Sequence, residues 1–247
     1  TNTSLGFFLK PFTVMMKVGL QVLSRTMKSH LEGVSDSLGN MRNQIGMTFF
    51  RAYASSEAEY NQGGCHIRFQ MPITFTPYYY NDKLMGAKEN ASKTQVAPQL
   101  SVSYFLTARL QATLSGGIAQ REVDEQNFYQ GLLMRDYRNL YTGFMDYTAD
   151  KSKHISFNIN YKRPLATIFA NAYIRKSWSD SHLTVARDFV GDYIINSYFS
   201  NSSSSENLMA GGKVSKGLGF MHGLVSVGFD YLRFDGFLRQ NDSPSAY

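Results

Sequence analysis

The side chains of this sequence that could perform acid–base or metal chemistry are few and lie far apart. The five histidines are His30, His66, His154, His182 and His222. No two of them are four residues apart, the spacing of two ligands on one helix face, and no cysteine or carboxylate cluster accompanies them. The sequence therefore predicts no metal site and no cofactor.

Nucleophilic catalysis is also not indicated. Cys65 is followed directly by His66, but adjacent side chains on a strand point to opposite faces, so this histidine would not activate the thiol. The sequence has no Gly-x-Ser-x-Gly elbow and no phosphate-binding loop. The closest acid–histidine pairs, Asp180 with His182 and Asp150 with His154, are typical of polar loops. We therefore predict that the protein is not an enzyme and has no catalytic residues.

Aromatic and arginine side chains gather in the polar stretch 121–150, and they are the candidates for ligand binding. Aromatic rings stack on sugars or apolar ligands, and arginine binds carboxylate or phosphate. The same side chains would equally serve to hold this connection against its neighbours. The candidate residues are Phe128, Tyr129, Arg135, Tyr137, Arg138 and Tyr141.

Composition excludes several classes of protein. The net charge is +6, but the basic residues are spread along the chain rather than concentrated, which argues against a nucleic-acid partner. Aromatics make up 14% of the chain, which excludes a disordered tail, and the single cysteine excludes a disulfide scaffold. No stretch has the roughly 20 apolar residues of a membrane-spanning helix.

Alternation of apolar and polar residues with a period of two dominates the sequence. In residues 154–162, Ile155, Phe157, Ile159 and Tyr161 face one way and the polar residues between them face the other. The same pattern occurs in 14–22, 66–79, 110–118, 166–178 and 225–231. Less regular segments at 4–9, 43–59, 97–106 and 206–216 bring the prediction to about ten strands. Pro72 cannot donate to a ladder, so we expect a bulge there.

The connections between these strands alternate in length, which predicts an up-and-down antiparallel meander. Short connections lie near residues 10–12, 61–64, 106–108, 163–164 and 217–219, and long polar ones near 27–41, 81–95, 121–150 and 179–204. Short turns at one end and long loops at the other are typical of outer-membrane barrels. Aromatic groups such as Tyr78-Tyr79-Tyr80 stand at strand ends, where such barrels have aromatic girdles.

A closed barrel is the only sheet that pairs every backbone group inside a membrane. The apolar residues of each strand would then face lipid. The polar residues would face a wet lumen or a plug, and those we assign to the lumen are Arg68, Gln70, His154, Ser156, Asn158 and Asn160. The predicted fold is an all-β, antiparallel, up-and-down transmembrane β-barrel.

Several motifs resemble the barrel of TonB-dependent outer-membrane receptors. Residues 157–172 (FNINYKRPLATIFANA) are similar to an NYKxPLxxLFAN hairpin of that family, and Tyr137-Arg138-Asn139-Leu140 precedes it. Residues 214–220 resemble its SKGFxF turn, and 50–55 resemble its RxYAS strand. These motifs are strand and turn signatures that cover most of the chain with gaps.

The resemblance implies more than these 247 residues contain. Such receptors have about 22 strands and a plug domain. They take up scarce nutrients across the cell outer membrane with energy from an inner-membrane TonB complex, in some cases with a surface lipoprotein. Residues 1–247 would be an internal section of the barrel without the plug, because 243–247 read as a loop rather than as a final strand. The nutrient is not identified by the sequence.

Two alternatives to this interpretation stay open. Ten strands could close alone as a complete small outer-membrane barrel, acting as an adhesin, a pore or an enzyme with its site on the rim. The chain could instead be a soluble extracellular β protein that binds a partner.

Overall fold

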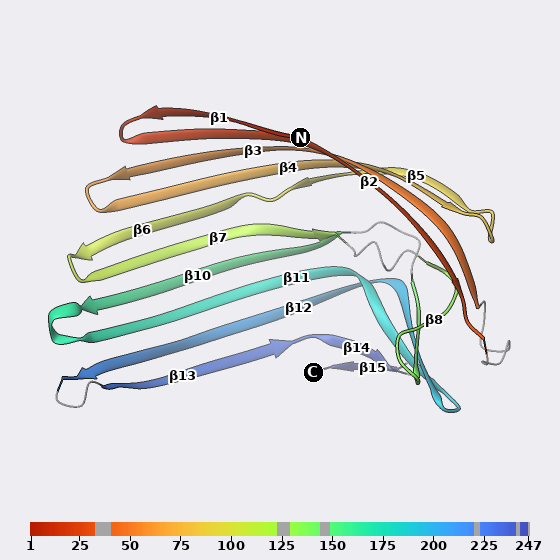
Figure 1. Cartoon of the computed structure of the whole chain (residues 1–247). Helices are drawn as coiled ribbons and strands as arrows, with labels where there is room; N and C mark the ends of the chain where they lie inside the picture. Colours follow the sequence, from red (N-terminus) through yellow and green to blue (C-terminus); the bar gives the residue numbers. More distant parts are fainter. Residues whose placement is uncertain (33–40, 123–128, 144–148, 220–222, 241–242, 247) are drawn as a thin grey trace.

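The computed structural model describes residues 1–32, 41–122, 129–143, 149–219, 223–240 and 243–246. Their strands join into a single 15-stranded sheet, which curves through space as a broad arc (Figure 1). None of the described residues belongs to a helix with the length and hydropathy that crossing a bilayer requires.

The long strands follow one another in chain order across the sheet. They are β1 (Asn2–Leu9), β2 (Phe12–His30), β3 (Arg42–Gln62), β4 (Cys65–Asp82), β5 (Lys88–Val96), β6 (Gln99–Thr107), β7 (Leu110–Glu122), β10 (Ala149–Arg163), β11 (Ile168–Val190), β12 (Tyr193–Leu218) and β13 (Gly223–Asp235). The smaller elements are β8 (Leu133–Met134), β9 (Asn139–Thr142), the 3₁₀ turn η3 (Pro164–Ala166), β14 (Phe237–Gln240) and β15 (Ser243–Ala246).

All the long strands pair antiparallel with their neighbours, as the predicted meander requires. Since β5 and β6 pair in turn with successive parts of β4, they act as one interrupted strand, and ten strands run from β1 to β13. Among the described residues, β1 pairs with β2 alone and β13 with β12 alone. The sheet is therefore an open arc, and these ten strands do not close on one another.

Pro72 does not produce the expected bulge between β3 and β4. Their register continues unchanged through the pair Ser55 and Pro72. The carbonyl of Pro72 accepts a hydrogen bond from Ala97 N at 3.1 Å, so the missing N–H of this proline faces the β5–β6 side. That is where the partner strand is interrupted, between Val96 and Gln99. The bulge prediction was wrong because the proline affects only the neighbour toward which its own donor would point.

One face of the sheet carries an apolar residue at every strand along a continuous row of paired positions. We call this face the outer face and the opposite one the inner face. The row consists of Leu9, Phe12, Tyr60, Ile67, Val102, Leu114, Phe157, Ile174, Ala210 and Tyr231. Most of these side chains are exposed in the isolated chain, as expected for residues that face lipid.

The strands are staggered in one direction, as in a barrel. Tyr60 of β3 pairs with Phe12, the first residue of β2, yet β3 continues to Gln62 before it turns. In the same way, β6 extends three residues beyond the partner of the first residue of β4, and β10 and β12 each extend two residues beyond the partners of the first residues of β7 and β11. The total stagger is nine residues over the seven steps from β2 to β12. With about 3.3 Å per residue and about 4.8 Å between strands, this stagger gives a tilt of about 40°, within the range of β-barrels.

The apolar band on the outer face has the height of a membrane. On β10 it is bounded by Lys153 at one end and Arg163 at the other, ten residues apart. Ten residues of strand measure about 33 Å, and a tilt of about 40° reduces this to about 25 Å, the height of the apolar band in outer-membrane barrels. At the Lys153 end of the band, Lys176 Nζ lies 5.2 Å from the centre of the Trp178 ring.

The short turns lie at one end of the sheet, as predicted, but two of the expected long loops are continuations of strands (Figure 1). Residues 179–204 belong to the β11–β12 hairpin, whose turn at Gly191 has a positive φ of 58°. Residues 81–95 belong to the β4–β5 hairpin. Their polar composition resembles that of a loop because both faces of these extensions lie beyond the apolar band.

Beyond the band, the polarity of β2, β3 and β4 is reversed. Ile45, Met47 and Phe49 of β3 point to the inner face and form a buried cluster with Tyr78 and Tyr80 of β4. Of the three adjacent tyrosines predicted as a girdle, Tyr79 alone points outward and is exposed. The inner face of these extensions is thus a packing surface for another part of the chain.

Candidate functional site

The six residues assigned to the lumen all lie on the inner face. Arg68 and Gln70 come from β4, and Ser156 of β10 follows Arg68 along a single row of paired positions. This row is polar throughout: Glu59, Arg68, Ser101, Ser115, Ser156 and Arg175. It lies next to the apolar row of the outer face, so the two faces differ sharply in polarity at the same height.

The inner face has a part with ion pairs and a part rich in hydroxyl and amide side chains. On β2–β4, Glu57 is buried and pairs with Arg68 Nη2 at 2.5 Å and with Lys17 Nζ at 3.7 Å. Arg68 Nε also lies 3.3 Å from Glu59.

On β7 and β10 the contacts are between hydroxyls and amides. Ser115 and Ser156 are joined at 2.7 Å, and Asn160 Nδ2 donates to Asn158 Oδ1. His154, also on this part of the wall, is half-buried. Small hydroxyl and amide side chains leave space next to the inner face and present both hydrogen-bond donors and acceptors.

Residues 129–142, which we call the strap, lie between the extensions of β2–β4 and of β11–β12. The strap contains the short hairpin β8–β9, and β9 pairs in parallel with Ile194–Ser197 of β12. Tyr129 packs in the cluster of Ile45 and Phe49, while Leu132 and Leu140 pack with Met41. In Figure 1 the extensions of β2–β3 and of β11–β12 both curve downward at the end opposite the short turns, and the strap with β8 lies beside them.

Two buried asparagines fix the strap to the two walls. Asn43 of β3 donates through Nδ2 to Gly131 O at 3.2 Å and accepts from Gly131 N at 2.8 Å, and it also donates to Ser29 Oγ at 3.0 Å. A side chain at position 131 would collide with the carbonyl of Arg42, so only glycine allows this approach. On the other wall, Asn196 donates to Leu140 O at 3.4 Å.

The predicted ligand residues separate into a buried group and an exposed group. The ring of Tyr129 is completely buried, and this burial raises the pKa of its hydroxyl against the opposing effect of Arg135, so Tyr129 anchors the strap. Arg135 lies over the ring of Tyr141 at 4.6 Å. Arg138 lies 5.7 Å from the ring centre of Tyr137, which is 80% exposed. Phe128 falls outside the described residues.

The exposed turn of the strap is held in shape by Asp136. Its carboxylate accepts from the backbone N–H of Arg138 at 3.0 Å and of Asn139 at 2.8 Å, and from the Asn139 amide at 2.7 and 2.8 Å. These donors lower the pKa of Asp136, the backbone N–H of Arg138 contributing most. The turn therefore presents Tyr137 and Arg138 to solvent in a fixed arrangement.

Asn43, Gly131 and Asn196 were not among the predicted site residues. Their roles depend on contacts between residues 88 and 56 positions apart, which no local pattern announces. Among the described residues, no three His, Cys, Asp or Glu side chains gather in a way that would hold a metal ion.

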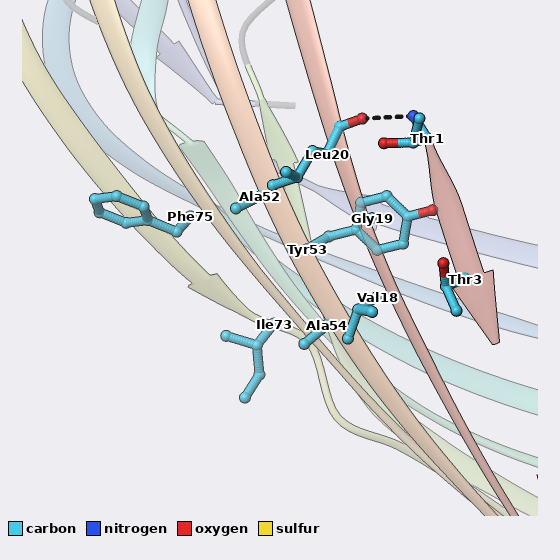
Figure 2. Close-up of a pocket in the computed structure, with 10 residues that line it drawn as sticks. All are labelled: Thr1, Thr3, Val18, Gly19, Leu20, Ala52, Tyr53, Ala54, Ile73 and Phe75. Atoms are coloured by element: carbon cyan, nitrogen blue, oxygen red, sulfur yellow. Dashed lines mark hydrogen bonds between the residues drawn. The ribbon is translucent and has the colours of Figure 1, made fainter. Parts of the chain in front are cut away.

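Two furrows of similar size lie on the outer face. The first, of about 420 Å³, lies where Ala52 and Ala54 of β3 stand between the larger Val18 and Ile73 (Figure 2). In this view the ring of Tyr53 lies across Gly19, which has no side chain to oppose it. The second furrow, of about 440 Å³, crosses β10–β13. Both are shallow depressions in the apolar surface.

Comparison with solved structures identifies the class of fold. The chain superposes on the copper transporter OprC with a TM-score of 0.69 and 11% identity, covering 95% of this chain and 36% of OprC. The FrpB iron transporter from Neisseria meningitidis gives 0.61 at 14% identity, covering 94% of this chain and 36% of FrpB. The ferric citrate transporter FecA in its unliganded form gives 0.59 at 13% identity, covering 95% and 34%.

This chain thus shares the fold of part of the sheet of these three transporters, and it spans about a third of their length. No protein-family model matches the sequence, and no curated protein matches it either.

Proposed function

We propose that residues 1–247 are part of the barrel of a TonB-dependent outer-membrane receptor that takes up a nutrient. The observation that carries this proposal is the pair of opposite faces, one apolar and one polar, on ten strands tilted like those of a barrel. The fold shared with three transporters over at least 94% of this chain supports it. The remaining strands, the plug and the contact with the TonB complex would belong to other parts of the protein.

In this proposal the protein performs no covalent chemistry. A nutrient first meets the exposed turn of the strap, where Tyr137 offers an aromatic surface and Arg138 a cation for a carboxylate or phosphate group. Arg135 and Tyr141 form a second such pair on the same hairpin. Passage then follows the hydroxyl and amide side chains of the inner face, with the plug as the gate. A surface lipoprotein that assists binding is a further partner in this proposal, and nucleic acid has no role in it.

The membrane location is tested by extraction. We expect the full-length protein to sediment with the outer membrane and to enter solution only with detergent, because the apolar row would otherwise be exposed to water. Urea or carbonate washes serve as the control for peripheral attachment. Release of a monodisperse protein by these washes alone would contradict the membrane location and favour a soluble extracellular β protein.

Uptake is tested in cells that lack or express the full-length protein. Copper and ferric citrate, which the names of two similar transporters mention, are the first cargoes to compare, by measuring cell-associated metal. We expect Tyr137→Ala combined with Arg138→Ala to reduce uptake of the cargo about tenfold, since a charge-assisted hydrogen bond and a stacking contact are both lost. The matched control is Tyr79→Ala with Lys88→Ala, on the outer face of the extensions. Equal uptake by the two double variants would contradict binding at the strap.

A further inference from the structure

The furrow that crosses β10–β13 owes its shape to small side chains. Ala170 and Ala172 of β11 and Gly212 of β12 form its floor. Larger apolar residues also line it: Ile159 and Tyr161 of β10, Val214 of β12, and Val227 and Phe229 of β13. These positions belong to two adjacent rows of the outer face, so the furrow opens toward the surrounding membrane. Its dimensions suit a flexible hydrocarbon chain lying along the surface.

Two cationic side chains lie at the end of this furrow that is nearer the short turns. Arg163 of β10 and Lys216 of β12 both pair with Ile168 of β11, which places them in one row of the outer face. This row is two residues, or about 7 Å, from the furrow floor at Ala170. Lys216 Nζ donates one hydrogen bond to Ala166 O at 2.8 Å, which fixes the ammonium group while leaving two of its hydrogens for another acceptor.

The furrow of Figure 2 has no such ending. In the rows that adjoin it on β2–β4, the outward-facing residues are Met16, Ser56, Met71, Val22, Phe50 and Pro77, and none carries a charged side chain. The two furrows therefore share size and apolar lining but differ in cationic side chains. The cationic side chains would make the furrow of β10–β13 selective for an anionic molecule, whereas any hydrocarbon could cover the furrow of Figure 2.

We propose that the furrow of β10–β13 binds an anionic phospholipid of the leaflet on the side of the short turns. One acyl chain occupies the floor formed by Ala170, Ala172 and Gly212, and the phosphate lies between Arg163 and Lys216. The occupant combines hydrocarbon with a negative charge at the boundary of the apolar band, which matches the chemistry of the site. This site goes beyond nutrient uptake and does not depend on the cargo, although it does require the membrane location.

The charge requirement is tested with Arg163→Gln combined with Lys216→Gln in the detergent-solubilised full-length protein. Dioleoyl phosphatidylglycerol is the probe, and dioleoyl phosphatidylethanolamine is the neutral comparison, with bound lipid counted by native mass spectrometry. Each cation near a membrane surface favours an anionic lipid by about 1 kcal/mol, or about fivefold, so we expect retention of phosphatidylglycerol to fall about 25-fold. The control, Lys162→Gln with Arg175→Gln, removes the same charge from the inner face of β10 and β11, outside the lining of the furrow, and should retain the lipid.

The furrow itself is tested with Ala172→Leu, which fills its floor with an apolar group suited to a lipid-facing position. We expect this variant to lose retention of both lipids, whereas Ala54→Leu, in the furrow of Figure 2, should not. Equal retention by the charge variant and its control would overturn the proposal, as would an absence of lipid on the unaltered protein or occupation by a second protein copy. A failure of the membrane location would be recognised separately, because the protein would then leave the membrane without detergent.

Discussion

Replacing Phe157 with arginine is expected to destabilise the protein, because it places a charge near the middle of the apolar band. Phe157 lies in the row of apolar residues that crosses all ten strands, close to midway between Lys153 and Arg163. A guanidinium group there would face hydrocarbon, at a cost of about 2–4 kcal/mol at the bilayer midplane. The measurement is the free energy of unfolding of the full-length protein in lipid vesicles, from urea titrations followed by fluorescence.

The control differs by one position along the same strand. Asn158 lies on the inner face, where its amide oxygen already accepts a hydrogen bond from Asn160. Asn158→Arg is expected to cost less than about 1 kcal/mol, because the new charge stays in water. Similar costs for the two variants would show that the outer and inner faces do not correspond to lipid and lumen.

The strands within the apolar band could be predicted from the sequence because each has one polar face and one apolar face. Residues 154–162 gave the correct element and both faces, since β10 runs from Ala149 to Arg163. The same held for residues 66–79 within β4. Outside the band this contrast disappears. The serine-rich residues 201–205 have the composition of a loop, although they belong to β12 and residues 203–205 pair with β11.

The reversal of polarity on β3 had a signal that could have been found. Ile45, Met47 and Phe49 alternate on odd positions, whereas Phe50, Ala52 and Ala54 alternate on even ones. A change of parity without a turn means that the buried side of the strand changes. Here it marks where the strand leaves the apolar band and begins to pack against the strap. The sequence predicts 43–59 only as a less regular strand and does not predict the inner cluster with Tyr129.

Composition marked the segment that holds the candidate binding residues, but it did not show which of these residues are exposed. Aromatic and arginine side chains in 121–150 did indicate an unusual segment, but composition does not distinguish Tyr129, which is buried, from Tyr137, which is exposed. That distinction depends on which wall the strap contacts. The contacts are made by single amide groups on distant strands, and a single polar residue carries no periodic signal.

Removing the amide of Asn43 is expected to release one end of the strap. Its three hydrogen bonds join β2, β3 and Gly131, and both backbone groups of Gly131 depend on this side chain. In Asn43→Ala those two groups lose their partners in a buried place, which lowers the free energy of strap opening by about 2–4 kcal/mol. The amide of Gly131 should then exchange its hydrogen at least about thirtyfold faster, as measured by hydrogen–deuterium exchange of the full-length protein in detergent.

The strength of each contact predicts a graded series of effects. Asn196 makes one long bond to the strap at 3.4 Å and accepts another from Arg187 at 3.3 Å, so Asn196→Ala should loosen the strap less than Asn43→Ala. Asn90→Ala, at an exposed position of β5, should leave exchange in the strap unchanged. Because the strap lies beyond the apolar band, the unfolding free energy of the barrel strands should stay the same in all three variants. Exchange in the strap that is as slow in Asn43→Ala as in Asn90→Ala would mean that apolar packing alone, through Tyr129 and Leu140, holds the strap in place.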